Sequence, residues 1–460
     1  MHIRCNSLPL NGHLIEELPE QSLLRSMKTN IFILITCGLP FLIGCRGLVG
    51  GSGGTSAVNH VVFMLQENRS FDTYLGQLNV YRQSQGLPAD VDGMPANAAN
   101  PADDGTMIVP FKLNSLCIEN LSPAWLESHG DYNRWNPGGP ALMDGFVHTA
   151  QGLAKFEGFK DTAGKRAMGY YDAGDLPYYY FMATAFATSD RWFAPMPTNS
   201  PPNRIAAFAA TTQGHAHEPL QELTAPTIFH RLSQAGISWK IYYTDKTSSG
   251  APADSLDNYW PTFAKSHAEN IVPVSQYLTD VQNGTLPAFS FIEAGYFSGR
   301  DEHPGSGENI QAGQQYVASL INALMTSSSW KDSVFILSFD EGGAAYDHVV
   351  PMNAVRPDGI PPRDLTAGDP PGDFTRTGFR VPLIVVSPFT RKGFVSHTAA
   401  DYTAVLKFVE TRWGLSPLSK RDAAQMDMTE FFDFANPPWL TPPTPPAASV
   451  DTSRCYNSLP

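Results

Sequence analysis

The stretch VVFMLQENRSFD at residues 61–72 joins five apolar residues directly to a polar, acidic segment. A second stretch of the same kind, VFILSFDEGG, occupies residues 334–343. Short apolar runs followed by polar residues are typical of buried parallel strands. In open α/β sheets the ligand crevice lies just beyond the carboxyl ends of the strands. Both acidic segments are therefore predicted to meet at one site on that edge of a sheet.

The chemistry of these segments predicts a metal ion. Carboxylate and amide oxygens suit a hard or borderline divalent cation, and two adjacent acids are costly to hold together without one. The segments supply such oxygens from Glu67, Asn68, Asp340 and Glu341. The identity of the cation does not follow from these residue types.

Length and charge set broad limits on function. The 460 residues are enough for one large α/β domain or two ordinary ones. The formal net charge of −13 argues against a nucleic-acid groove and against attraction to an anionic membrane surface. An anionic substrate is still allowed, because a metal ion and a helix N-terminus supply local positive potential.

Residues 1–45 are interpreted as a targeting segment. Met27 and Lys28 precede an apolar run at residues 31–35, and the segment ends in LIGC at residues 42–45. This pattern resembles a bacterial lipoprotein signal in which Cys45 carries the lipid, with residues 1–26 as an upstream extension. An ordinary secretory signal and a single anchor helix are the alternatives. We expect an exported protein anchored to a membrane through Cys45, or otherwise a periplasmic or secreted one.

The rest of the chain divides into three parts. Residues 46–57 are a Gly-rich spacer, residues 58–436 a single α/β catalytic domain, and residues 437–460 a stiff Pro-rich tail. Strands are predicted from apolar runs and helices from their periodicity. The predicted strands are 61–65, 239–243, 289–292, 334–337 and 383–386, and the predicted helices 175–187, 205–210, 227–235, 314–325 and 402–413.

Two cysteines, Cys117 and Cys455, would remain in the mature domain. In an exported protein such a pair can form a disulfide that pins the C-terminal tail. Two unrelated free thiols fit the sequence nearly as well.

Ser200 is the most informative hydroxyl. It precedes Pro201, which is the pattern of a helix N-cap with proline at the first helical position. A hydroxyl there lies beside free backbone N–H groups and the positive end of the helix dipole, which favour a phosphate or a developing alkoxide. The capping preference alone also accounts for such a serine.

Several motifs give the chain a specific resemblance. It resembles the bacterial phosphoesterase family that includes phosphatidylcholine-type phospholipases C and an acid phosphatase, and that has an alkaline-phosphatase-like fold. The resemblance implies a three-layer α/β sandwich with a mostly parallel central sheet. The matching segments are residues 67–76, 168–171, 175–177, 189–193, 202–204, 340–343, 346–349, 378–382 and 387–388.

The resemblance implies roles for individual residues. Glu67 and Asn68 correspond to the first metal ligands, Asp340 and Glu341 to the second acidic pair, and Ser200 to the nucleophile. Phospholipase-like members carry a threonine in a Gly-Pro-Thr sequence at the nucleophile position, whereas this chain reads Thr-Asn-Ser at 198–200. Thr198 is therefore a second candidate nucleophile.

Three histidines are candidates for contacts to the phosphoryl oxygens: His129, His303 and His348. His348 follows the Asp340-Glu341 pair after one short glycine loop, which makes it the best placed of the three in the sequence. The family often has a further histidine where this chain has Pro123.

The sequence thus predicts a metal-dependent phosphoesterase that forms a phosphoseryl intermediate on Ser200. Small soluble phosphate esters are the favoured substrates, because the chain ends soon after the family domain. The alternatives are a phospholipase C that acts on phosphatidylcholine-type lipids and, in another class, a non-catalytic surface-binding lipoprotein. No nucleic-acid partner is expected.

Overall fold

A computed structural model describes residues 54–305 and 309–455. The predicted targeting segment, Cys45 and most of the predicted spacer lie outside the described residues. Within the described ranges, no helix has the length and apolar character needed to cross a membrane.

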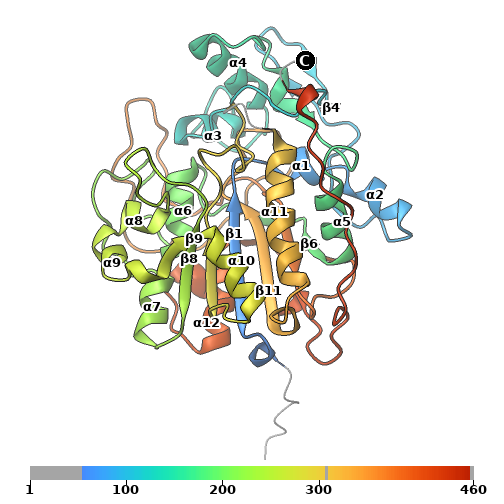
Figure 1. Ribbon diagram of the computed structural model, residues 1–460. Helices are drawn as coiled ribbons and strands as arrows, with labels where there is room; N and C mark the ends of the chain where they lie inside the picture. The colour runs from blue at the N-terminus through green and yellow to red at the C-terminus, as the bar shows by residue number, and fades with distance from the viewer. Residues whose placement is uncertain (1–53, 306–308, 456–460) are drawn as a thin grey trace, which may run out of the picture. The chain divides into compact units, whose positions relative to one another are not determined.

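An eight-stranded sheet forms the centre of the fold (Figure 1). The strands follow one another in space in the order β13 (Phe394–Ser396), β6 (Ala187–Ser189), β12 (Leu383–Val386), β11 (Ser333–Phe339), β1 (His60–Gln66), β10 (Phe289–Ile292), β8 (Trp239–Tyr243) and β9 (Ile271–Pro273). All neighbouring strands pair in parallel except where β12 pairs antiparallel with β11 and β6. The predicted α/β fold with a mostly parallel central sheet is confirmed.

Helices cover both faces of this sheet. In Figure 1, α10 (Val274–Asn283) and α11 (Ile310–Met325) lie across the near face, and α12 (Thr403–Trp413) lies behind the sheet. α11 packs against α5 (Pro177–Ala185), and α12 packs against α6 (Ser200–Ala209), which in turn packs against α7 (Ile228–Gln234). The central strands are buried on both faces, as their continuous apolar runs predict.

The remaining elements lie outside the central sheet and the helices named above. The other helices are α1 (Phe71–Leu75), α2 (Leu78–Ser84), α3 (Trp125–Tyr132), α4 (Phe146–Glu157), α8 (Ser255–Tyr259), α9 (Pro261–Lys265) and α13 (Lys420–Ala423). Short strand pairs are β2 (Asn100–Pro101) with β3 (Met107–Ile108), β4 (Phe111–Lys112) with β5 (Gly169–Tyr170), and β7 (Trp192–Phe193) with β14 (Ala400–Asp401).

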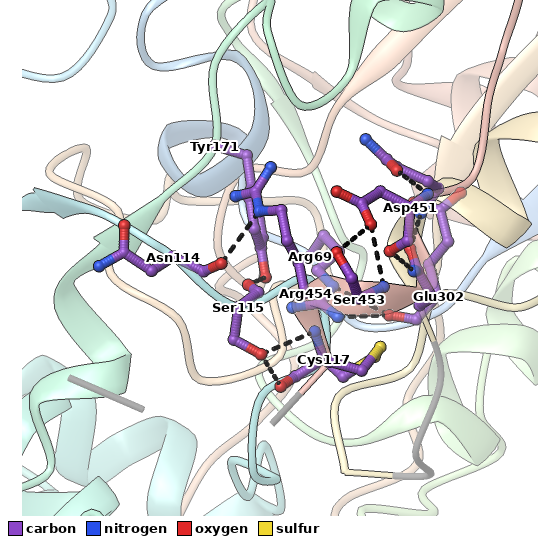
Figure 2. Close-up of a disulfide and its surroundings, with 12 residues drawn as sticks. Arg69, Asn114, Ser115, Cys117, Tyr171, Glu302, Asp451, Ser453 and Arg454 are labelled. Carbon is purple, nitrogen blue, oxygen red and sulfur yellow. Dashed lines mark hydrogen bonds between the residues drawn. A yellow bond between two sulfur atoms is a disulfide. The ribbon is translucent and has the colours of Figure 1, made fainter. Parts of the chain in front are cut away.

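The C-terminal segment is cross-linked to the domain. Cys117 forms a disulfide with Cys455, which decides between the two alternatives for these residues (Figure 2). Arg454 also pairs with Asp175 at 2.7 Å, and the Asn309 amide donates a hydrogen bond to the Asp451 carbonyl at 2.8 Å. In Figure 1 this red segment runs past α5 toward β4, so its extended chain is packed against the domain.

The register of β1 and β11 brings the two acidic segments together. Gln66 lies opposite Phe339, and the Asp340 amide donates a hydrogen bond to the Gln66 carbonyl at 3.0 Å. Glu67 and Asp340 therefore follow adjacent strand ends, where the sequence predicts a common site.

Candidate functional site

The two strand ends form a tight backbone turn around Asn68. The Asn68 amide donates a hydrogen bond to Asp340 Oδ1 at 3.2 Å, and Asn68 itself has a φ of 56°. Gly343 has a φ of +67°, and a Cβ at that position would lie 2.2 Å from the Asn68 carbonyl oxygen. Gly343 is therefore required for the close approach of these two loops.

Ser200 lies at the centre of this arrangement. Its Oγ lies 3.1 Å from Glu67 Oε2 and 3.2 Å from Asn68 Oδ1, and either oxygen can accept the hydroxyl proton. The side chain is half-buried. Ser200 is the first residue of α6, and Asn199 occupies the N-cap position. The prediction that Ser200 is the N-cap is therefore wrong by one residue, and its hydroxyl contacts the predicted metal ligands instead.

Thr198 faces another way. It is buried, and its Oγ1 donates a hydrogen bond to the Ala216 carbonyl at 2.7 Å. The Asn203 side chain fixes the same loop by donating to the Thr198 carbonyl at 2.8 Å. Ser200, and not Thr198, is thus the hydroxyl that reaches the strand ends.

Arg204 is a site residue to which the sequence reasoning gave no role. One turn after Ser200 on α6, its buried guanidinium pairs with three carboxylates: Glu67 at 2.6 Å, Asp340 at 3.2 Å and Glu293 at 3.4 Å. The helical spacing of four residues from Ser200 is the signal that could have indicated a shared face.

Burial and neighbouring charge perturb the acids strongly. Burial and the charge of Glu67 raise the pKa of Asp340 to about 8. Burial also opposes ionisation of Glu67, but Arg204 and His303 outweigh it and hold the pKa of that carboxyl below its ordinary value. Burial and then Asp340 raise the pKa of Glu341 well above its ordinary value. The strand ends therefore hold more carboxyl groups than Arg204 alone can keep ionised.

The four predicted ligands fit a divalent cation in their chemistry. All four offer oxygen atoms, and Glu341 Oε1 is buried without a hydrogen-bond partner among the described residues. The remaining Glu341 oxygen accepts from the Gly343 amide. With Arg204 between Glu67 and Asp340, the three acids do not converge on one point in this structure. An ion that binds there would have to compete with Arg204 for these oxygens.

A second group has the geometry of a metal site. Within the described ranges, one set of three or more His, Cys, Asp or Glu residues brings its ligand atoms within 4.8 Å of one another: Asp72, Asp347 and His348. Buried Arg380 donates to Asp347 Oδ1 at 2.8 Å and to Asp72 Oδ1 at 2.9 Å. Arg380 pairs with both acids of this cluster, whereas at the strand ends Glu341 Oε1 has no hydrogen-bond partner among the described residues, so the cluster needs a cation less than the strand ends do.

His348 belongs to this second group. Its Nδ1 lies 2.7 Å from Asp72 Oδ2, and its Nε2 lies 3.1 Å from Asp92 Oδ1. Although burial opposes it, pairing with Asp72 raises the pKa of His348. Both ring nitrogens are therefore used by carboxylates, and no hydrogen bond between this histidine and Ser200 is found among the described residues.

His303 lies nearer the strand ends. The Glu67 amide donates a hydrogen bond to the Asp301 carbonyl at 2.8 Å, which ties the loop of His303 to the end of β1. The ring Nδ1 donates to the Pro304 carbonyl at 2.5 Å. The charge of His303 also lowers the pKa of Glu67, as noted above.

His129 lines a cavity of about 170 Å³ together with Arg376 and Pro197. Its Nδ1 donates to the Trp125 carbonyl at 2.6 Å, and burial lowers its pKa to about 4. At neutral pH this imidazole is uncharged, and its Nε2 can accept a hydrogen bond but cannot donate one.

A larger pocket of about 300 Å³ opens beside Ser200. Glu67, Ser200 and Arg204 form one wall of this pocket. The opposite wall comes from the loops that follow β8 and β10, and its other lining residues are Thr247, Ala253, Asp254, Ser255, Asn258, Tyr259, Tyr296 and Phe297. The pocket has room for an organic group attached to a phosphate at Ser200.

The fold and this site together define an α/β protein with a hydroxyl held among acids at a helix N-terminus, an arrangement suited to phosphoryl groups. Residues 58–416 match the model of the Phosphoesterase family, and the chain belongs to this family. The predicted family is confirmed, and the protein is a hydrolase that acts on phosphoric esters.

Curated relatives with similar sequences are phospholipases C. Phospholipase C B of Mycobacterium tuberculosis is 28% identical over 89% of this chain and 82% of that protein. The hemolytic phospholipase C of Pseudomonas aeruginosa is 30% identical over 83% of this chain and 57% of that protein.

A solved structure is more distant. A protein in the alkaline phosphatase superfamily from Vibrio parahaemolyticus is 12% identical, with a TM-score of 0.35, over 76% of this chain and 78% of that chain.

Proposed function

We propose that this protein is a metal-assisted phosphoesterase that cleaves its substrate through a covalent phosphoseryl intermediate on Ser200. The observation that carries this proposal is the position of the Ser200 hydroxyl, within 3.2 Å of both Glu67 and Asn68 at the N-terminus of α6. A serine hydroxyl is a weak nucleophile until a neighbouring group activates it. The strand ends supply such groups.

Glu67, Asn68, Asp340 and Glu341 would hold the divalent cation, which when bound would lower the pKa of a coordinated hydroxyl and offset phosphate charge. Ser200 Oγ attacks phosphorus, its proton passes to Glu67 Oε2, and the bond from phosphorus to the leaving oxygen breaks. Arg204 and the free N–H groups of α6 face the phosphoryl oxygens. Water then releases phosphate or a phosphomonoester from the serine and restores the hydroxyl.

The histidines would take different parts in this reaction. His303, whose loop is tied to the end of β1, is the best placed to donate to a phosphoryl or leaving-group oxygen. His129 is neutral and can serve only as an acceptor at neutral pH. His348, bound by Asp72 and Asp92, would position the neighbouring loops and would not contact substrate.

The relatives favour a phospholipase C activity for the substrate class. Both relatives named above are phospholipases C, and the pocket beside Ser200 would accept one organic substituent of a phosphodiester. A monoesterase, which the sequence alone favours, is the second candidate because the same pocket would accept the leaving group of a small aryl phosphate. We also propose that the protein is exported and anchored through Cys45.

A substrate panel tests this proposal. The purified protein is stripped with a chelator and reloaded with Mn²⁺, Zn²⁺ or Ca²⁺. It is then assayed on an aryl phosphomonoester, the corresponding diester and phosphatidylcholine in mixed micelles, with Ser200→Ala as the control. We expect metal-dependent turnover with the highest kcat/KM on the phosphodiesters. A higher value on the monoester would select the second candidate, and no turnover on any ester with any metal would favour a binding lipoprotein.

A further inference from the structure

The cavity of about 170 Å³ lies between α3 and the loop of residues 371–376. Trp125 and His129 of α3 line one side of it, and Phe374 and Arg376 line the other. It shares no lining residue with the larger pocket beside the candidate nucleophile. The proposed reaction leaves this cavity without a ligand.

His129 offers the cavity a hydrogen-bond acceptor. Its Nδ1 lies 2.6 Å from the Trp125 carbonyl and donates to it, so the proton of the neutral ring is on Nδ1. Its Nε2 has no hydrogen-bond partner among the described residues. Burial, and after it the charge of Arg376, lower the pKa of this ring to about 4. At neutral pH the ring therefore presents a lone pair on Nε2 and no positive charge.

Arg376 supplies a positive charge on the other side. Its guanidinium carbon lies 5.4 Å from the centre of the Tyr132 ring, and the His129 ring centre lies 5.4 Å from the same point. The Arg376 side chain is partly exposed and has no ion pair within the described ranges. A guanidinium has five N–H donors and no acceptor, so this one is free to bind an oxyanion.

The acids nearest the cavity already have other partners. Asp373 lines the cavity, and its Oδ1 accepts from the Thr375 backbone N–H at 3.1 Å. Asp369, whose charge acts on His129, pairs with His217 at 2.7 Å. Neither acid pairs with the guanidinium in the described part of the chain. The guanidinium is therefore available to an anion from outside.

The cavity adjoins the loop that precedes Ser200. Pro197, three residues before Ser200, is one of its lining residues. The segment that carries Arg376 is bonded to the same loop, because the Gly378 N–H donates to the Ala194 carbonyl at 2.9 Å. An anion in this cavity would thus lie against the nucleophile loop and apart from the acids at the strand ends.

A lone pair opposite a guanidinium selects one kind of anion. A fully deprotonated oxyanion would set an oxygen lone pair against Nε2, whereas an oxyanion that keeps a proton can donate its O–H there. Hydrogen phosphate has such an O–H at neutral pH, and sulfate has none. We propose that this cavity binds a phosphate group that keeps a proton, with its charge on Arg376 and its O–H donated to His129 Nε2. The site is additional to the proposed function and requires neither the cation nor Ser200.

Isothermal titration calorimetry on the chelator-stripped protein compares the ligands at a fixed ionic strength. At pH 7.5 we expect inorganic phosphate to bind at least about tenfold more tightly than sulfate, because sulfate leaves Nε2 without a donor. A phosphate ester has a second pKa of about 6, so phosphocholine lacks the O–H at pH 7.5 and has it at pH 5.5. Tighter binding of phosphocholine at pH 5.5 than of free phosphate would identify a phosphomonoester product as the natural source of the group.

Two variants assign the contacts. Arg376→Gln removes the charge and should weaken phosphate binding at least about tenfold. His129→Phe keeps a ring against Trp125, whose ring centre lies 4.5 Å from that of His129, and removes Nε2. It should bring the affinities for phosphate and sulfate together. If His129→Phe does not fold, the comparison of the two anions on the parent protein still tests the acceptor.

Arg391→Gln is the matched control. The Arg391 guanidinium also stacks on an aromatic ring, 5.6 Å from the centre of Phe394, but it lines neither this cavity nor the pocket beside Ser200. This variant should bind phosphate as the parent protein does. Ser200→Ala is a second control, because phosphate held at the nucleophile would respond to it.

The outcomes are distinct. Equal affinities of the parent protein for phosphate and sulfate, or tight binding of phosphocholine at pH 7.5, would overturn the inference, because the O–H would not be needed. Unchanged phosphate binding by Arg376→Gln would overturn it as well, and its loss in Ser200→Ala alone would place the anion at the nucleophile. Since these titrations involve neither metal nor turnover, none of these results decides the metal-assisted mechanism, which the substrate panel tests separately.

Discussion

Replacing Arg204 by methionine should show how much of the protein's folding stability depends on one buried guanidinium. The guanidinium is the shared partner of Glu67, Asp340 and Glu293, at 2.6–3.4 Å. Removing one partner of a buried ion pair costs about 3–5 kcal/mol, because an uncompensated charge stays behind. The three contacts use a single guanidinium, so their losses are not additive. We therefore expect Arg204→Met to lower the free energy of unfolding by about 3–5 kcal/mol without metal.

The loss should depend on pH. In the folded variant the three acids that lose Arg204 as a partner must be protonated. Their pKa values in the folded variant therefore lie above those in the unfolded chain. Stability conferred by such groups is present at low pH and is lost as the pH rises. The difference in unfolding free energy between parent and variant should consequently be smaller at pH 5 than at pH 8. Urea unfolding followed by circular dichroism at both pH values measures it.

Metal addition supplies a second arm of this experiment. Without Arg204 these carboxylates have no ion-pair partner among the described residues, so Mn²⁺ should restore more stability to the variant than it adds to the parent protein. Arg82→Met is the control, because its guanidinium is buried but its partner Asp90 is 44% exposed and keeps its water. The reasoning would be refuted if Arg204→Met were no less stable than Arg82→Met at pH 8 in the absence of metal.

Three further predictions concern other parts of the protein. Thr198→Ala should keep kcat within a few-fold of the parent value while losing about 1 kcal/mol of stability, since its hydroxyl bonds to the Ala216 carbonyl and the Asn199 side-chain oxygen and not to the acids at the strand ends. An inactive but folded Thr198→Ala would transfer the nucleophile to Thr198. Burial and then Asp422 raise the pKa of Glu410 to about 9, so the stability advantage of Glu410→Gln should grow as the pH rises from about 5 to about 9; a pH-independent difference in unfolding free energy would contradict it. Cys455→Ser opens a disulfide whose cysteines are 338 residues apart, and it should cost about 2–5 kcal/mol in thermal unfolding under oxidising conditions; an equal response of parent and variant to dithiothreitol would argue against the cross-link.

The sequence predicts the central strands well because a strand that is buried on both faces consists of a continuous apolar run. The apolar runs identify β1, β8, β10, β11 and β12, and each begins and ends within a few residues of its observed bounds. The direction of a strand does not change its apolar pattern. Nothing in the run at 383–386 shows that β12 runs opposite to the other strands of the sheet. Strand direction depends on the loops that precede and follow the strand.

Part of the candidate site can be predicted from the sequence, because it lies at the ends of these apolar strands. Glu67 and Asp340 follow recognisable strands, so their proximity follows from the sheet. The contacts of Arg204 depend on how α6 packs on that sheet, which periodicity does not specify. The His348 cluster joins residues 72, 92, 347 and 380, and only the folded loops bring them together.

The sequence preferences for helix N-caps misplaced the start of α6 by one residue. Asn199 and Ser200 are both favourable N-cap residues, and the preference for proline at the first helical position pointed to Ser200. In the structure the helix begins one residue earlier, with Asn199 in the cap position. This small shift turns the Ser200 hydroxyl toward Glu67 and away from the helix backbone.

Trapping the covalent intermediate tests the central claim most directly. The metal-loaded protein is mixed with an aryl phosphate ester, quenched in acid within the first turnover, digested and examined by mass spectrometry. The account predicts phosphate on the peptide that contains Ser200, located on Ser200 itself, and no such modification in Ser200→Ala. Rapid turnover with no phosphorylated peptide at any quench time, or with phosphate on Thr198, would contradict it.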